Sequence, residues 1–129
     1  MDSQTDPGAT LALHRMRHDL APAAADAFKA FSDTVFADGA LPTRFKELIA
    51  VAVAHVTQCP YCIRGHTQRA LRQGVTQEEL MEAIWVAAEM RAGGAYAHAS
   101  LAIDTMQQEA ARKEQPARKE QPARKEQPE

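Results

Sequence analysis

The chain has 129 residues with a formal net charge of −2, and this length accommodates one domain. Residues 111–129 hold 6 Lys/Arg and 4 Asp/Glu, and the other residues hold 9 Lys/Arg and 13 Asp/Glu. The main part of the chain therefore has no excess of basic residues, so we do not expect nucleic acid as a partner. No apolar stretch approaches the roughly 18 residues of a membrane span, and the polar segment Met1–Pro7 lacks the apolar core of a secretory signal. We therefore expect a cytoplasmic protein with no membrane partner.

The composition predicts an all-α fold. Alanine is abundant, whereas aromatic residues make up only 5% of the chain, which favours helix over sheet. A polar leader, residues 1–19, precedes a single compact helical domain of about five to six helices, residues 20–109. We expect helices at about residues 22–37, 42–58, 60–74, 76–91 and 95–108.

Local signals set most of these helix boundaries. Pro22 and Pro60 suit the first turn of a helix, where a missing N–H costs nothing. Thr76 and Glu79 have the spacing of a capping box, in which each side chain bonds the other residue's backbone N–H. Gly93-Gly94 is expected to form a turn between the last two helices.

The middle of the 42–58 helix is apolar on every side. The run Leu48–Val56 contains one polar residue, His55, so we expect this helix to be buried all round. A core of about 90 residues offers too few neighbours to cover such a helix. We therefore expect the protomers to form a homo-oligomer.

Residues 110–129 form a separate low-complexity tail. Here the unit Ala-Arg-Lys-Glu-Gln-Pro occurs three times, and each proline interrupts any helix. The repeat contains nothing that could join a core, so we expect a solvated, disordered or loosely extended segment.

Both cysteines of the chain lie in the sequence Cys59-Pro-Tyr-Cys62-Ile-Arg-Gly-His66. On a helix, Cys59, Cys62 and His66 fall within about 60° of one another. A thiol needs a base or a positive field to become a thiolate and a second thiol to close a reversible disulfide, and this segment supplies both. Position at the helix start alone favours Cys59 as the nucleophile, whereas proximity to His66 favours Cys62.

Glu47 is the carboxylate best placed to join these groups. It precedes Cys59 by twelve residues and shares a helix face with Val51 and Ala54. If this face leads toward the thiols, Glu47 lies at the edge of a dry pocket and could relay a proton. The alternative is an ordinary solvent-facing glutamate in the first helical turn.

The combined spacing of Glu47, Cys59, Cys62 and His66 resembles the alkylhydroperoxidase D and carboxymuconolactone decarboxylase superfamily. The segment Ala70-Leu-Arg-Gln-Gly-Val-Thr-Gln-Glu-Glu-Leu80 is similar to that family's continuation, and the resemblance covers about residues 20–108. It implies an all-helical protomer, assembly into trimers or hexamers, and thiol peroxidase activity.

The resemblance also implies a role for each site residue. Cys62 matches the cysteine that attacks the peroxide, and Cys59 matches the resolving cysteine. Glu47 and His66 match a proton relay. An external dithiol, such as a dihydrolipoyl carrier or a thioredoxin-like protein, would reduce the disulfide again.

Two further residues are possible auxiliaries. Tyr61 stands where the best-known members of the family have a histidine, and a phenol donates hydrogen bonds but is a poor base near neutral pH. His55, one helical turn before Cys59, is either a buried histidine with a satisfied hydrogen bond or a member of the relay.

We therefore predict a peroxidase or disulfide reductase that reduces hydroperoxides through the Cys59–Cys62 pair and needs no metal or organic cofactor. One alternative is a zinc module built from Cys59, Cys62 and His66 with His55 or Glu47. Another is a decarboxylase-like enzyme in which the cysteines are incidental. A third is a non-catalytic scaffold whose tail binds a partner.

Overall fold

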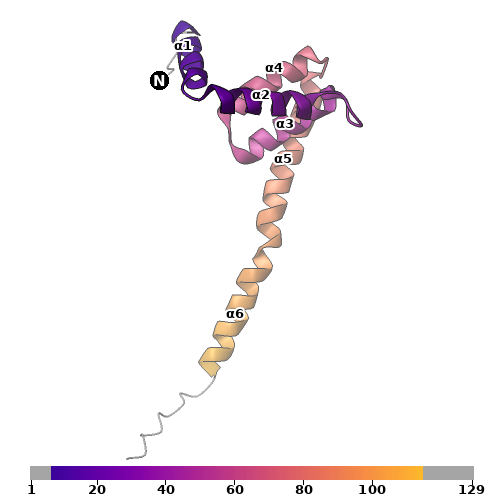
Figure 1. Ribbon diagram of the computed structural model, residues 1–129. Helices are drawn as coiled ribbons and strands as arrows, with labels where there is room; N and C mark the ends of the chain where they lie inside the picture. Colours follow the sequence, from indigo (N-terminus) through magenta and orange to yellow (C-terminus); the bar gives the residue numbers. More distant parts are fainter. Residues whose placement is uncertain (1–6, 115–129) are drawn as a thin grey trace, which may run out of the picture. The chain divides into compact units, whose positions relative to one another are not determined.

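The structure, a computed structural model, describes residues 7–114 and contains only helices within that range (Figure 1). This confirms the predicted all-α fold. The helices are α1 (Pro7–Asp19), α2 (Pro22–Phe36), α3 (Thr43–Thr57), α4 (Pro60–Arg72), α5 (Gln77–Ala97) and α6 (Ala99–Glu114). None of them is long and apolar enough to cross a membrane.

The chain divides into two units after Ala87. The first unit contains α1 to α4 and the beginning of α5, and it holds all the chemical groups singled out in the sequence. Its core is small: Val51 and Ala70 are fully buried, and Val75 and Leu80 pack with them. Leu48 and Ile84 contact this cluster from its edge. The core thus joins α3 to α4 and to the start of α5.

A reversal of only two residues joins α3 to α4. Gln58 adopts a left-handed conformation with φ of 56°, and its N–H bonds the Ala54 carbonyl oxygen at the end of α3. Cys59 follows in an extended conformation as the N-cap of α4, with Pro60 in the first turn. The tight connection forces α3 and α4 to pack side by side, so residues of α3 face the beginning of α4.

The start of α5 confirms the predicted capping box. The Thr76 N–H donates to Glu79 Oε2 at 2.8 Å, and the Glu79 N–H donates to Thr76 Oγ1 at 3.2 Å. The Arg44 guanidinium also donates to both carboxylate oxygens of Glu79, at 2.5 and 2.6 Å. The cap therefore ties α5 to the first turn of α3.

Two predicted boundaries are wrong. Gly93 and Gly94 do not form a turn but lie inside α5, which continues to Ala97. Glycine in a helix costs only about 1 kcal/mol relative to alanine, and good helix formers surround this pair. The interruption falls at His98, and α6 then extends to Glu114, within the first copy of the repeat. The rest of the repeat tail lies outside the described residues.

The segment predicted as a polar leader, with a helix from about Leu11, contains α1 over Pro7–Asp19. Within it, the side chains of Leu11, Leu13 and Met16 are all exposed. A helix that buries so little apolar surface adds little to the core of the protomer.

Within the protomer α3 is buried on one face only, and burial of its other faces depends on the expected neighbouring protomers. Glu47, Val51 and Ala54 are buried, but Ile49 and Val53 are about half exposed, at 50% and 52%. The physical reason is that α4 covers only one face of α3, and a single chain supplies too few further helices to cover the others.

The capping box generates a prediction about stability and pH. The Thr76 N–H and, after it, the Arg44 guanidinium hold the pKa of Glu79 below its ordinary value of 4.5. A carboxyl whose pKa falls on folding stabilises the fold at pH values above its ordinary pKa, and this contribution disappears as the pH falls through the lowered value. We expect Glu79→Gln to reduce the unfolding free energy at neutral pH and to lose its effect in acid.

Urea unfolding at a series of pH values measures this difference. Glu78→Gln is the matched control, because it removes a negative charge from the same helical turn and leaves the cap intact. An equal, pH-independent loss in both variants would contradict the role of the cap.

Candidate functional site

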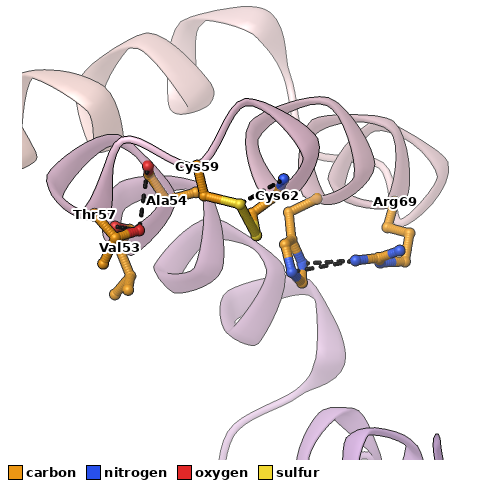
Figure 2. The surroundings of a disulfide bond; sticks show 7 residues. Val53, Ala54, Thr57, Cys59, Cys62 and Arg69 are labelled. Atoms are coloured by element: carbon orange, nitrogen blue, oxygen red, sulfur yellow. Dashed lines mark hydrogen bonds between the residues drawn. A yellow bond between two sulfur atoms is a disulfide. The ribbon is translucent and has the colours of Figure 1, made fainter. Parts of the chain in front are cut away.

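Cys59 and Cys62 form a disulfide at the beginning of α4, with their Cα atoms 5.3 Å apart (Figure 2). Cys59 is the N-cap, and Cys62 lies in the first helical turn. The Cys62 backbone N–H donates to Cys59 Sγ at 3.3 Å. The sequence prediction of a CxxC pair at a helix N-terminus is therefore confirmed.

The two sulfur atoms differ in their surroundings. Cys59 is half-buried, and its sulfur accepts the N–H bond that a capping oxygen usually accepts, at the positive end of the α4 dipole. This position favours a Cys59 thiolate whenever the disulfide opens. Cys62 is exposed and therefore accessible to a reactant from solvent.

Glu47 is buried, with only 2% of its surface exposed, so it is not the solvent-facing glutamate of the alternative interpretation. Its Oε2 lies 2.7 Å from His66 Nδ1, which brings α3 and α4 together at the site. Because a carboxylate only accepts hydrogen bonds, we assign the proton to Nδ1 of the neutral imidazole. Nε2 is then the ring atom that can accept a further proton.

Arg69 completes this cluster, and the sequence reasoning missed it. Its Nε donates to Glu47 Oε1 at 3.2 Å, and a terminal nitrogen lies 3.0 and 3.2 Å from the two ring nitrogens of His66. The signal that could have found it is the spacing, because Arg69 follows His66 by three residues on the same face of α4. A buried carboxylate also requires a compensating cation.

Phe36, the last residue of α2, stacks on His66 with ring centroids 5.1 Å apart and an angle of 29° between the planes. Two residues of α3 hold this end of α2 in place. Thr43 Oγ1 donates to the Phe36 carbonyl oxygen at 2.7 Å, and Lys46 Nζ donates to the carbonyl oxygens of Val35 and Ala37. These bonds satisfy the last carbonyls of α2 and fix the aromatic ring against the imidazole.

Cys62 and His66 line one pocket of about 410 Å³. The rest of its wall is mostly apolar and comes from α2 and α3. These residues are Val35, Phe36, Lys46, Ile49, Ala50, Val53, Ala54 and Thr57. The pocket therefore brings a sulfur atom and an imidazole to the same apolar space, and Cys59 is not among its lining residues.

The two auxiliary candidates lie apart from this pocket. Tyr61 is 84% exposed. His55 Nδ1 lies 2.7 Å from the Val51 carbonyl oxygen, one turn earlier on α3, so the predicted hydrogen bond is present, but the side chain is half-buried and not buried as expected. Among the described residues, no three His, Cys, Asp or Glu side chains are grouped so that they could share a metal ion.

Residues 22–105 match the carboxymuconolactone decarboxylase family, which is well over half of the chain. The chain belongs to this family. The match begins at the first residue of α2 and ends within α6, so it includes the disulfide, Glu47, His66 and Arg69. The predicted superfamily is thereby confirmed.

The chain is also similar to proteins of known sequence and structure, one of which is a member of this family. "Uncharacterized protein 4 in cox locus" of Paracoccus denitrificans is 66% identical over 83 residues, which are 64% of this chain and 75% of that protein. A crystal structure from Methanobacterium thermoautotrophicum is 42% identical with a TM-score of 0.62, over 64% of this chain and 93% of that one. The apo structure of a carboxymuconolactone decarboxylase family protein from Legionella pneumophila is 33% identical with a TM-score of 0.59, over 77% and 88%.

The hydrogen bond between Glu47 and His66 can be measured by a double-mutant cycle. We expect Glu47→Ala and His66→Ala to be non-additive in urea unfolding, with a coupling of about 1.5–3 kcal/mol, because the bond involves a charged acceptor with little exposure. A control cycle combines Glu47→Ala with Arg64→Ala, an exposed position on α4. Coupling of the same size in both cycles would contradict a specific bond.

Proposed function

We propose that this protein is a thiol-dependent peroxidase or disulfide reductase that reduces hydroperoxides through Cys59 and Cys62. One observation carries the proposal: Cys62 and His66 line the same apolar pocket, and the imidazole is bonded to the buried Glu47 carboxylate. A nucleophile, a base and a group that orients the base are the parts required for activated thiol chemistry. Membership of a family that includes enzymes agrees with this proposal.

The reaction begins with the reduced pair. His66 Nε2 takes the proton of the Cys62 thiol, and the thiolate attacks the terminal oxygen of the hydroperoxide. The O–O bond breaks, Cys62 becomes a sulfenic acid, and the departing alkoxide takes the proton back from the imidazolium and leaves as an alcohol. The Glu47 carboxylate holds the ring and stabilises the imidazolium while it carries the proton.

Cys59 then resolves the intermediate. Its thiolate, favoured by the Cys62 N–H and the α4 dipole, attacks the sulfenic sulfur and the S–O bond breaks. The Cys59–Cys62 disulfide forms, and the departing hydroxide takes a proton from solvent to become water. An external dithiol reduces the disulfide by exchange and is itself oxidised. The exposure of Cys62 supports attack on this sulfur by a lipoyl carrier or a thioredoxin-like protein. A transient disulfide of this kind suits a reducing cytoplasm.

A decarboxylase-like activity is the second candidate. Glu47, His66 and Arg69 contact one another without help from the sulfur atoms, so this cluster could move protons for another reaction at the same pocket. A variant with both cysteines replaced by serine separates the candidates. It abolishes peroxide reduction and leaves proton chemistry at the cluster intact.

The decisive test is the reaction of the reduced protein with one equivalent of an organic hydroperoxide. We expect intact mass spectrometry to show the loss of two hydrogens, with both thiols consumed. Cys62→Ser is expected to be inert, and Cys59→Ser is expected to stop at a sulfenic acid on Cys62. A sulfenic acid on Cys59 in Cys62→Ser would reverse the two roles, and unreacted thiols in the unmodified protein would contradict the proposal.

We also propose that the protomers associate, as a trimer or a hexamer. Large apolar side chains are exposed on α2, α3 and α5 of the first unit, among them Phe31, Val53 and Trp85 at 63%, 52% and 70%. Apolar side chains that one protomer leaves exposed can be covered by neighbouring protomers. Light scattering is expected to give three or six times the protomer mass, and charged substitutions such as Phe31→Glu or Trp85→Glu are expected to lower it. A monomer at micromolar concentration contradicts this proposal.

A further inference from the structure

A second pocket, also of about 410 Å³, lies on the carboxylate side of the relay. Unlike the apolar pocket beside Cys62, it is lined largely by polar and charged side chains from α2, α3 and α4, including Glu47, Arg69 and Arg72. Phe36 is the residue that lines both pockets, and its ring stacks on His66. The relay thus has an apolar pocket on its His66 side and a polar pocket on its Glu47 side.

Arg69 contacts both members of the relay, Glu47 and His66. Its Nε donates to Glu47 Oε1 at 3.2 Å, whereas His66 bonds the other carboxylate oxygen, Oε2. Its terminal nitrogen lies within 3.2 Å of both imidazole nitrogens. Because the Arg69 side chain is 51% exposed while that of Glu47 is 3% exposed, the guanidinium also separates the carboxylate from solvent.

The charges explain why this contact matters. A buried carboxylate is strongly disfavoured unless a cation and hydrogen bonds compensate it. His66 cannot act as a permanent cation, because it must gain and lose a proton in every cycle of the proposed reaction. Arg69 is the fixed positive charge in contact with Glu47. Its Nε–H bonds Oε1 while His66 bonds Oε2, so the two contacts together restrict the carboxylate to one orientation.

We infer that Arg69 is a positioning residue of the Glu47–His66 relay, holding both groups in line between an apolar reactant pocket and a polar pocket open to small solutes. The inference rests on the proposed function, because it assigns Arg69 to the same proton relay. Arg69 does not touch the thiols in this role. It acts by fixing the carboxylate that in turn fixes the imidazole.

The first arm of the test is chemical rescue. Arg69→Ala is expected to slow the single-turnover oxidation of Cys62 by an organic hydroperoxide by roughly 10–100-fold, the loss typical of a misplaced catalytic group. Millimolar guanidinium, entering the polar pocket, is expected to restore much of the rate, whereas equal sodium chloride is not. Arg69→Lys is expected to be intermediate, because an ammonium replaces the charge but not the fork.

Arg72→Ala is the matched control. Arg72 lines the same pocket from the same helix, but within the described chain the side chains that bond Glu47 are His66 and Arg69. We expect Arg72→Ala to react at the unmodified rate with no response to guanidinium. Rescue of Arg69→Ala by guanidinium also separates a positioning role from a general loss of folding, since guanidinium weakens the folded state and cannot restore a fold that the substitution has destabilised.

The second arm does not depend on peroxide chemistry. The His66 Nδ1 proton, bonded to Glu47, is expected to give a slowly exchanging downfield imidazole resonance in the unmodified protein, which Arg69→Ala loses and guanidinium restores. If the unmodified protein reacts with hydroperoxide but Arg69→Ala reacts equally fast, the inference is overturned and the proposed function stands. If the unmodified protein is inert, the proposed function fails, and an unchanged imidazole resonance in Arg69→Ala overturns the inference as well.

Discussion

The buried carboxylate of Glu47 is the constraint on which the rest of the site depends. A charge with 2% of its surface exposed must have partners, and these partners come from the neighbouring helix: His66 at 2.7 Å and Arg69 at 3.2 Å. Both distances require α3 and α4 to lie side by side in a fixed register. The two-residue reversal at Gln58 and Cys59 produces that register, and it also sets Cys59 at the helix N-cap.

The same arrangement distributes the chemistry between two environments. Cys62 and His66 line an apolar pocket, whereas Glu47 and Arg69 line a polar one. Phe36 lines both pockets. An apolar space strengthens electrostatic interactions at a reacting sulfur and excludes competing water. A polar space allows a relay to exchange protons with solvent. The proton path that we propose needs helix ends that stay in place, and hydrogen bonds such as that of Thr43 hold them.

The small core and the exposed apolar side chains have the same physical cause. In the first unit, Val51 and Ala70 are fully buried, but Ile49 and Val53 on the same α3 helix remain half exposed. One protomer of this length cannot surround an apolar helix. The side chains that line the apolar pocket are therefore also part of a surface that we propose neighbouring protomers approach.

Much of this protein could be predicted from sequence because the relevant signals are local. The all-α fold, the capping box of Thr76 and Glu79, and the position of Cys59 at a helix start follow from propensity and from residues three or four apart. The predicted turn at Gly93-Gly94 was wrong, because the flanking helix formers outweigh the modest loss of helix stability that each glycine causes. The burial of Glu47, the stacking of Phe36, the contact of Arg69 and the two pockets needed the tertiary structure, since each depends on how separate helices pack. The sequence by itself determined which reactive groups exist and which helix carries them. Only the packing of α2, α3 and α4 decided which of them meet, because hydrogen bonds and burial between helices depend on distances that spacing along one helix does not set.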